Sequence, residues 1–285
     1  MARFQSLFSA MFTLAVLSVS NAEADRIAPP PISARVGQAE LVIVGKTTKL
    51  ETKKVLLPPY PGAKNKTQFV VGVVQIKEQL KGKVKLTHVR VAFFPPPANT
   101  PKGGYYLQRH LTLGEECCLF LQQDPKQNLY VLRQYFSVLT PGKNKKLYEQ
   151  QVKQVKDTMR VLNDPDKALG SKVKADRLSA ASILLLHYRS YPQSRPTGST
   201  VVQEPISAER SKLLLTALAE MDWTKPRADY QTTPLALFYS LGVTKADGWT
   251  PPTDFRKRPT AAQEWIRKHK SSFRIKRWAL KKTGS

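Results

Sequence analysis

The sequence predicts an α+β protein with two domains, a five-stranded β-barrel at residues 36–140 and an irregular all-α domain at residues 141–285. In the first half, short apolar runs are separated by clusters of Gly and Pro, which is typical of β-strands. From Lys145 onward, apolar residues recur every three or four positions, which is typical of amphipathic helices. The chain has 285 residues, 41% of them hydrophobic, and this is enough for two modest cores.

The first 24 residues have the composition of an export signal. Arg3 gives a positive start, residues 7–19 are apolar apart from small hydroxyl side chains, and Ala22-Glu23-Ala24 matches the small-x-small pattern that signal peptidase recognises. The apolar run is shorter than the ~20 residues that span a bilayer, so we expect cleavage after Ala24 rather than retention as a membrane anchor. The sequence therefore predicts an exported protein, periplasmic or extracellular, without a transmembrane segment after signal cleavage.

A Pro-rich lead-in and the strands of the barrel are expected next. Residues 25–35 contain three consecutive prolines and are expected to run extended along the surface, because proline cannot donate to a β-ladder. The first strand, Ala39–Glu51, is long, and Gly45 would let it bend as a closed barrel requires. Residues 52–67 are expected to form a loop. The other four strands are expected at Gln68–Leu80, Val84–Phe94, Leu113–Gln122 and Leu129–Phe136.

The second domain is expected to contain only helices and loops. The first helix begins at Lys145, and Asn163-Asp164-Pro165 should end it. Residues 193–204 are rich in Pro, Gly, Ser and Thr and are expected to form a loop. The later helices are expected to start at the caps Ser171 and Ser207, at Pro234, and at a capping box formed by Thr260 and Gln263.

Several segments of the first domain carry a family resemblance. AELVIVGKTTKLE, VVGVVQIKEQLKGK, VKLTHVRVAFF and LGEECCLFL, between Val36 and Phe136, resemble the netrin-module or tissue-inhibitor-of-metalloproteinases type of OB-fold barrel. The resemblance implies an OB-like barrel. The inhibitory members of that family act through a cysteine at the mature N-terminus, whereas here no cysteine precedes Cys117. The layout of signal, netrin-like barrel and helical half also resembles exported bacterial proteins of unknown function.

Motifs for catalysis, metals and cofactors are absent from the sequence. It contains no C-x-x-C, G-x-S-x-G, G-x-G-x-x-G or P-loop spacing, and its four histidines are scattered. We therefore predict no catalytic residues, no metal and no cofactor. The adjacent Cys117 and Cys118 allow two interpretations: a vicinal disulfide switch, or one buried thiol with the other exposed or half-buried, because neighbouring strand residues point to opposite faces.

The strongest functional signal is positive charge at the C-terminus. The chain has 46 Lys and Arg against 21 Asp and Glu, a formal net charge of +25, and residues 256–282 hold eleven basic residues but one acidic residue. Interleaved aromatic residues make this segment a candidate for binding polyanions. The alternative is that Trp265, Phe273 and Ile275 pack into the helical core while the basic side chains only face solvent. The candidate anion-binding residues are Arg267, Lys268, Lys270, Arg274, Lys276, Arg277, Trp278, Lys281 and Lys282.

These observations favour an exported, non-enzymatic binding or structural protein that engages an anionic partner. Anionic polysaccharide, lipid headgroups or an acidic protein fit an exported protein, whereas nucleic acid is not an expected partner outside the cell. Two alternatives stay open. The protein could be an enzyme or enzyme accessory with a site between its two halves, or an inhibitor of proteases that acts through the barrel.

Overall fold

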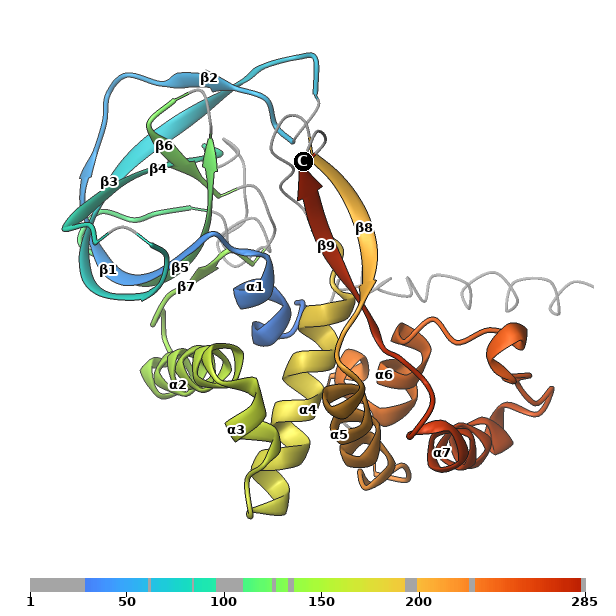
Figure 1. The fold of residues 1–285 in the computed structure, drawn as a ribbon. Helices are drawn as coiled ribbons and strands as arrows, with labels where there is room; N and C mark the ends of the chain where they lie inside the picture. The colour runs from blue at the N-terminus through green and yellow to red at the C-terminus, as the bar shows by residue number, and fades with distance from the viewer. Residues whose placement is uncertain are drawn as a thin grey trace, which may run out of the picture.

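A computed structural model describes residues 29–60, 63–83, 85–95, 110–124, 127–132, 136–192, 199–225 and 229–282 (Figure 1). The predicted signal and the first residues of the predicted lead-in lie outside this part of the chain. The class is α+β, with a mixed seven-stranded sheet in the N-terminal half and mostly helices in the C-terminal half. Within the described residues, no helix combines the length and the apolar character needed to cross a membrane.

Helix α1, Ile32–Gln38, forms where the sequence predicts the end of an extended lead-in. Its residues from Ile32 to Val36 are buried, so the prediction of an extended surface segment is wrong here. Pro31 directly precedes the helix, at a position where a missing N–H breaks no helical hydrogen bond. The buried Arg35 donates a hydrogen bond to the carbonyl oxygen of Phe136 at 3.2 Å, which ties α1 to the last residue of the fifth predicted strand.

The first strand is bent at the predicted glycine. In the pairing of β1 with β3, the register shifts between Val44 and Gly45. A Cβ on Gly45 would lie 2.4 Å from the carbonyl oxygen of Gln75, so only glycine allows β3 to approach this closely. The strands of the larger sheet are β1 Leu41–Leu50, β2 Val55–Leu57, β3 Thr67–Lys81, β4 His88–Phe93, β5 Glu116–Asp124, β6 Leu129–Val131 and β7 Val138–Leu139.

The strand pairings return to their starting point. β1 pairs with β3, β3 with β4, β4 with β6, β6 with β5, and β5 pairs again with β1. A ring of five strands cannot alternate direction all the way round, so at least one neighbouring pair must be parallel, and here that pair is β4 with β6. The short β2 lies within the predicted loop at residues 52–67, where the sequence prediction is therefore wrong.

Both cysteines lie on β5 and are free thiols. Cys117 packs with the apolar side chains on one face of the sheet, and Cys118 packs on the other face with Phe120 and Tyr148. The opposite orientations agree with the sequence argument against a vicinal disulfide. The expectation of one exposed or half-buried thiol is wrong, because both faces of β5 are covered and both cysteines are buried.

The helices of the second half follow the predicted apolar periodicity. As expected, Ser207 caps α5 by accepting from the N–H of Arg210, and Pro234 lies in the first turn of α6. Two predicted starts are wrong: α4 follows Val173 rather than Ser171, and α7 begins at Arg258, ahead of Thr260. The helices are α2 Lys145–Asn163, α3 Pro165–Leu169, α4 Lys174–Arg189, α5 Ala208–Ala219, α6 Pro234–Ser240 and α7 Arg258–His269.

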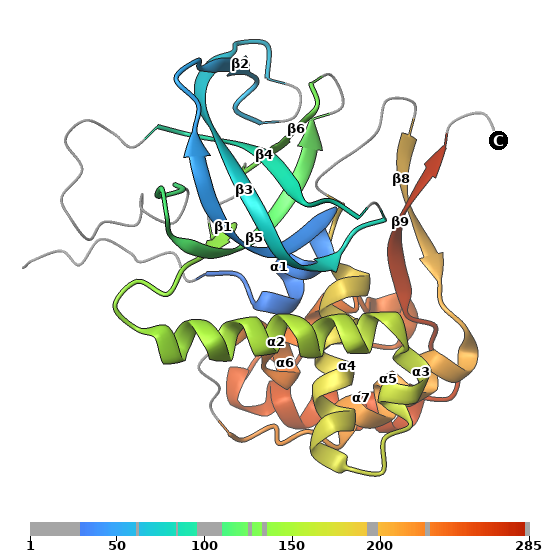
Figure 2. The ribbon, with the colours of Figure 1, turned by 90° about the vertical axis from the view of Figure 1, so that its left-hand side faces the viewer.

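A two-stranded antiparallel ribbon contradicts the prediction of an all-α second half. Strand β8, Ser199–Pro205, pairs along its length with β9, Lys276–Lys282. The sequence predicted a loop for most of β8 and the end of a helical domain for β9. Buried Ile206 and Ile275 fix the base of the ribbon, where the N–H of Ile206 donates to the carbonyl oxygen of Ile275 at 2.9 Å. Figures 1 and 2 show the ribbon extending from the helices beside the larger sheet.

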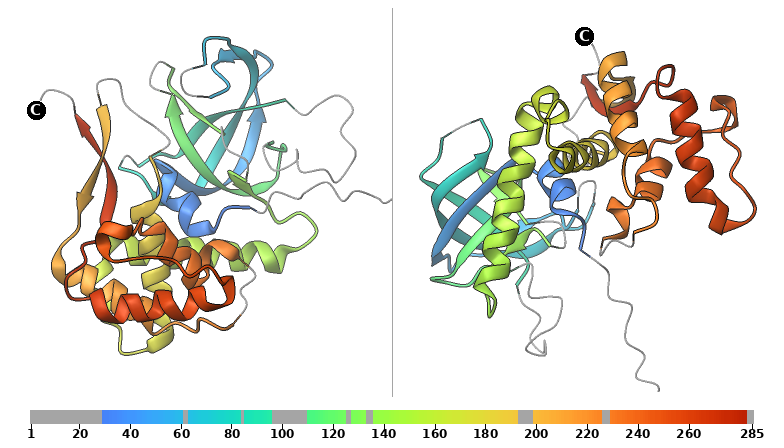
Figure 3. Two further views of the ribbon diagram at one scale, coloured as in Figure 1. Left: turned by 90° about the vertical axis from the view of Figure 1, so that its right-hand side faces the viewer. Right: turned by 90° about the horizontal axis from the view of Figure 1, so that it is seen from below.

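Helix α2 joins the two halves. It lies between the larger sheet and the remaining helices (Figure 3), and its side chains Tyr148 and Val155 share a core with Val42 and Phe120 of the sheet. Helix α1 contacts both α2 and α4. The two halves that the sequence separates at residue 140 therefore share an apolar core.

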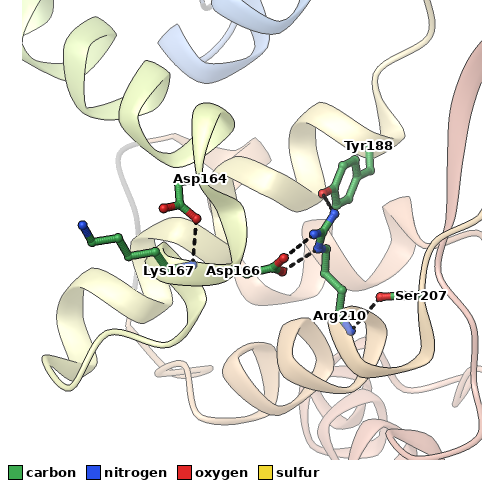
Figure 4. A network of polar contacts seen from close by, with 6 residues as sticks. All are labelled: Asp164, Asp166, Lys167, Tyr188, Ser207 and Arg210. Carbon is green, nitrogen blue, oxygen red and sulfur yellow. Dashed lines mark hydrogen bonds and ion pairs between the residues drawn. The ribbon is translucent and has the colours of Figure 1, made fainter.

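A polar network fastens α3 to α4 and α5 (Figure 4). Arg210 of α5 donates from Nε and Nη2 to the two carboxylate oxygens of Asp166 in α3, at 2.8 and 2.6 Å. Its Nη1 lies 3.4 Å from the hydroxyl of Tyr188 at the end of α4. A planar guanidinium that engages three helices in this way fixes their relative rotation.

Candidate functional site

The predicted anion-binding residues lie on α7, on β9 and in the connection between them, which begins with Lys270. Arg267 and Lys268 are exposed in the last turn of α7, whereas Lys276 to Lys282 form β9. Arg274 is exposed in the connection between the helix and the strand. Figure 1 shows β9 leading away from α7, so the nine residues form a path along the chain rather than one compact patch.

The aromatic and aliphatic residues of the same segment are structural. Trp265 and Ile275 are buried in the helical core, and Phe273 packs against it. The indole N–H of Trp265 donates to the carbonyl oxygen of Asp247 at 3.0 Å. This part of the alternative interpretation is confirmed. Phe273 and Trp278 are both half-buried, and Trp278 on β9 lies outside the helical core.

The basic side chains of this segment are poorly neutralised. Arg277 pairs with Glu204 of β8 at 3.3 Å. Among the described residues, no carboxylate forms an ion pair with Arg267, Lys268, Lys270, Arg274, Lys276 or Lys281. The side chain of Lys282 lies outside the described part. The charge of the segment is therefore available to an external anion.

Arg274 and Lys276 border a cavity of about 540 Å³ at the base of the ribbon. His269 also lines it and stacks on Trp265, with ring centroids 4.7 Å apart. Asp247 lines the cavity too, and one of its carboxylate oxygens accepts hydrogen bonds from the N–H and hydroxyl of Thr244. The cavity therefore combines two basic side chains with one acidic side chain.

A larger cleft lies where the sheet, α1, α4 and the ribbon meet. Two cavities, of about 810 and 550 Å³, share Glu40 and His187 in their walls, and we call them together the His187 cleft. The larger is lined by Lys81 at the end of β3, by Lys83 just after the strand, and by α2. The smaller is lined by α1, the end of α4 and β9, including Arg277. Of the nine predicted residues, Arg277 and Trp278 reach this cleft.

His187 is the central side chain of the cleft. Burial, together with the nearby charges of Lys81 and Arg277, lowers the pKa of His187 to about 4, so its imidazole is neutral at pH 7. A Cβ on Gly37 of α1 would lie 3.0 Å from its Nδ1, so glycine lets the helix end pack against the ring. Within the described chain, neither ring nitrogen of His187 forms a hydrogen bond, and the side chain lines both cavities.

Lys81 is held in place at the wall of the cleft. Its ammonium group donates to the carbonyl oxygens of Val36 and Gly37 at 2.8 and 3.3 Å, which satisfies the C-terminal end of α1. Burial lowers the pKa of Lys81, while the charge of Glu40 opposes this effect. Glu40 accepts a hydrogen bond from the backbone N–H of Gln123 at 3.1 Å. The cleft thus contains ordered charges of both signs with an excess of positive charge.

Sequence reasoning missed most of the cleft. The sequence predicts that the second strand ends at Leu80, just before Lys81, and gives His187 only as one of four scattered histidines. The cleft joins residues that are about 240 positions apart in the chain, which no local pattern reveals. The described residues contain no group of three His, Cys, Asp or Glu side chains positioned to hold a metal ion. No protein-family model and no curated protein sequence matches the chain significantly.

Proposed function

We propose that the protein is an exported, non-enzymatic binding protein that engages an anionic partner through the basic side chains of β9 and the connection before it. The observation that carries this proposal is the excess of positive charge on the ribbon, where Lys276 and Lys281 have no ion-pair partner among the described residues and Arg277 pairs with Glu204. Strand β9 has Lys276, Arg277 and Lys281 exposed, whereas β8 offers Glu204 as its one carboxylate. Unneutralised basic side chains attract a polyanion because binding releases its counterions.

The proposal includes two further assignments. Export is supported by the pattern of residues 1–24, and an OB-like barrel is supported by the ring of strand pairings with β4 and β6 parallel. The OB fold is a five-stranded Greek-key barrel, and its binding face commonly takes oligonucleotides or oligosaccharides. Fold likeness alone assigns no ligand. The partner classes that suit an exported basic protein are anionic polysaccharide, lipid headgroups and acidic protein.

A salt titration with matched variants tests the binding surface. Replacing Arg274, Lys276, Arg277, Lys281 and Lys282 by Gln should weaken retention on immobilised heparin. The slope of log affinity against log salt concentration should become shallower by about one for each lost contact. The control replaces five exposed lysines of the N-terminal half, which remove the same charge: Lys46, Lys49, Lys53, Lys54 and Lys64. An equal loss in both variants contradicts a specific surface. Unchanged retention with a lower Tm would make the segment structural.

The His187 cleft favours an enzyme as the second candidate function. It contains a neutral imidazole within a cleft that also holds Glu40 and Lys81, and these side-chain types can transfer protons. The test is turnover of ester, peptide, glycan and phosphate substrates by the purified protein. Turnover that is lost in His187→Asn with an unchanged Tm would replace the binding proposal by an enzymatic one.

A further inference from the structure

The His187 cleft has a composition that suits a sugar with a carboxylate. Its smaller cavity, about 550 Å³, is bordered by Tyr191 and Trp278, whose ring centroids lie 5.2 Å apart at an interplanar angle of 73°. Arg189 lies over the Trp278 ring, 5.7 Å from its centroid. These contacts hold the two rings on a rigid wall, and Tyr191 is 40% exposed. Aromatic rings offer an apolar surface to the C–H face of a sugar ring.

The polar groups of the cleft match the other parts of such a ligand. Arg277, Lys81 and Lys83 can pair with carboxylates. Gln123 and Asn163 in the larger cavity can bind hydroxyl groups. The two cavities are adjacent, because Glu40 and His187 line both.

The same features argue against an acyl chain or an acidic peptide. Both cavities are open to solvent, so an acyl chain would stay partly hydrated, although Leu80 and Met159 supply apolar surface. The acidic side chains of a peptide have no flat ring that could pack against the aromatic ring of Tyr191. A sugar ring with an apolar face, hydroxyl groups at its edge and a carboxylate can contact the aromatic, polar and basic side chains of the cleft.

We propose that the His187 cleft binds a short stretch of an acidic, uronate-containing polysaccharide, with sugar rings against Tyr191 and Trp278 and a carboxylate on Arg277. The inference rests on the proposed binding of an anionic partner and specifies its chemical class and its site. Neutral His187 then offers its unprotonated ring nitrogen to a sugar hydroxyl, and Lys81 adds positive charge behind it. The ribbon continues the basic path beyond the cleft, where further uronates can bind.

A basic side chain of the cleft and an exposed lysine outside the proposed binding surface provide a matched test. Arg277 lines the cleft, whereas Lys212 is exposed on α5 and lines neither of its cavities. Titration calorimetry with a trimer of 1,4-linked galacturonate should give a Kd about tenfold weaker in Arg277→Gln than in the wild type, and within about twofold of wild type in Lys212→Gln. Tyr191→Ala should also weaken binding about tenfold, and maltotriose, a neutral trimer, should bind at least about tenfold more weakly than galacturonate.

The outcomes separate this inference from the proposed function. Equal effects of Arg277→Gln and Lys212→Gln would overturn the assignment of the cleft, as would equal affinity for maltotriose and galacturonate. Binding to phosphatidylglycerol vesicles or polyglutamate without binding to the galacturonate trimer would also overturn it, while leaving the proposed anion binding intact. Lack of retention on every polyanion would instead contradict the proposed function itself. A melting curve for each variant checks that the fold is unchanged.

Discussion

Arg210 and Asp166 form a bidentate ion pair that joins α5 to α3, with N–O distances of 2.8 and 2.6 Å. The guanidinium lowers the pKa of the Asp166 carboxyl. A lowered pKa in the folded state stabilises the protein at pH values above the pKa of the unfolded chain, near 3.9, and the effect disappears as the pH falls through the folded pKa. Asp166 is 65% exposed, so solvent screening limits the contribution.

We predict that Asp166→Asn lowers the free energy of unfolding by about 0.5–1 kcal/mol at pH 7 and by much less near pH 2.5. Urea denaturation at the two pH values measures the difference. Glu264→Gln removes the same charge from an exposed carboxylate on α7 and should change stability less. A loss at pH 2.5 as large as at pH 7 would show that Asp166 does not act through its ionised form.

His187 should give the protein a specific sensitivity to weak acid. Its pKa lies at about 4 in the folded protein and near 6.5 in an unfolded chain, so protonation favours the unfolded state as the pH falls between these values. We expect the wild type to lose about 2 kcal/mol more between pH 7 and pH 4.5 than His187→Asn does. The control His88→Asn, at an exposed histidine, should keep the wild-type dependence. Parallel stability curves for His187→Asn and wild type would contradict the prediction.

Cys117 and Cys118 should be unreactive while the protein is folded. Burial raises the pKa of each thiol to about 12, so the thiolate that attacks a reagent is scarce at pH 8. We expect neither thiol to react with Ellman's reagent in the native protein and both to react in guanidinium chloride. Rapid modification of one thiol in the native protein would mean that one face of β5 opens readily.

Gly45 should be intolerant of a side chain. The added Cβ of Gly45→Ala would meet the backbone oxygen of Gln75 at 2.4 Å, so β1 and β3 would have to separate. We expect a loss of at least about 2 kcal/mol in the free energy of unfolding. Gly72→Ala is the comparison, because the three atoms nearest to its Cβ belong to side chains, of which Leu111 is the closest at 3.0 Å, and side chains can move. Similar losses at the two glycines would contradict the role assigned to the backbone contact.

Local sequence patterns predicted the helices and strands that depend on interactions between neighbouring residues. Gly45 indicated an irregularity in β1, and the recurrence of apolar residues from Lys145 onward indicated the amphipathic helix α2. Ser207 indicated the start of α5, since a side-chain cap acts within one helical turn. The failures concern long-range contacts. Residues 200–203 look like part of a polar loop until β9 pairs with them from about 75 positions away.

The candidate site was predictable only in part. The charge of the C-terminal segment is a property of composition, so the sequence identified Arg274, Lys276 and Arg277 directly. Whether an aromatic residue is buried depends on the surrounding fold, and only the structure separates Trp265, in the core, from Trp278, at the surface. The His187 cleft depends on the meeting of α1, α4 and β9. No single segment of the chain carries that information.

The shared core under α2 limits how the protein can be divided. Val42, Cys118 and Phe120 of the sheet are covered by side chains of α2, which comes after residue 140. A fragment that stops at residue 140 would leave this apolar face in water, and such a surface promotes aggregation. A fragment that continues to Asn163 would keep the apolar face of the sheet covered by α2 but would expose the opposite side of α2 to water. The two halves are therefore not interchangeable modules, and neither can be transplanted into another protein without redesign of the face it loses.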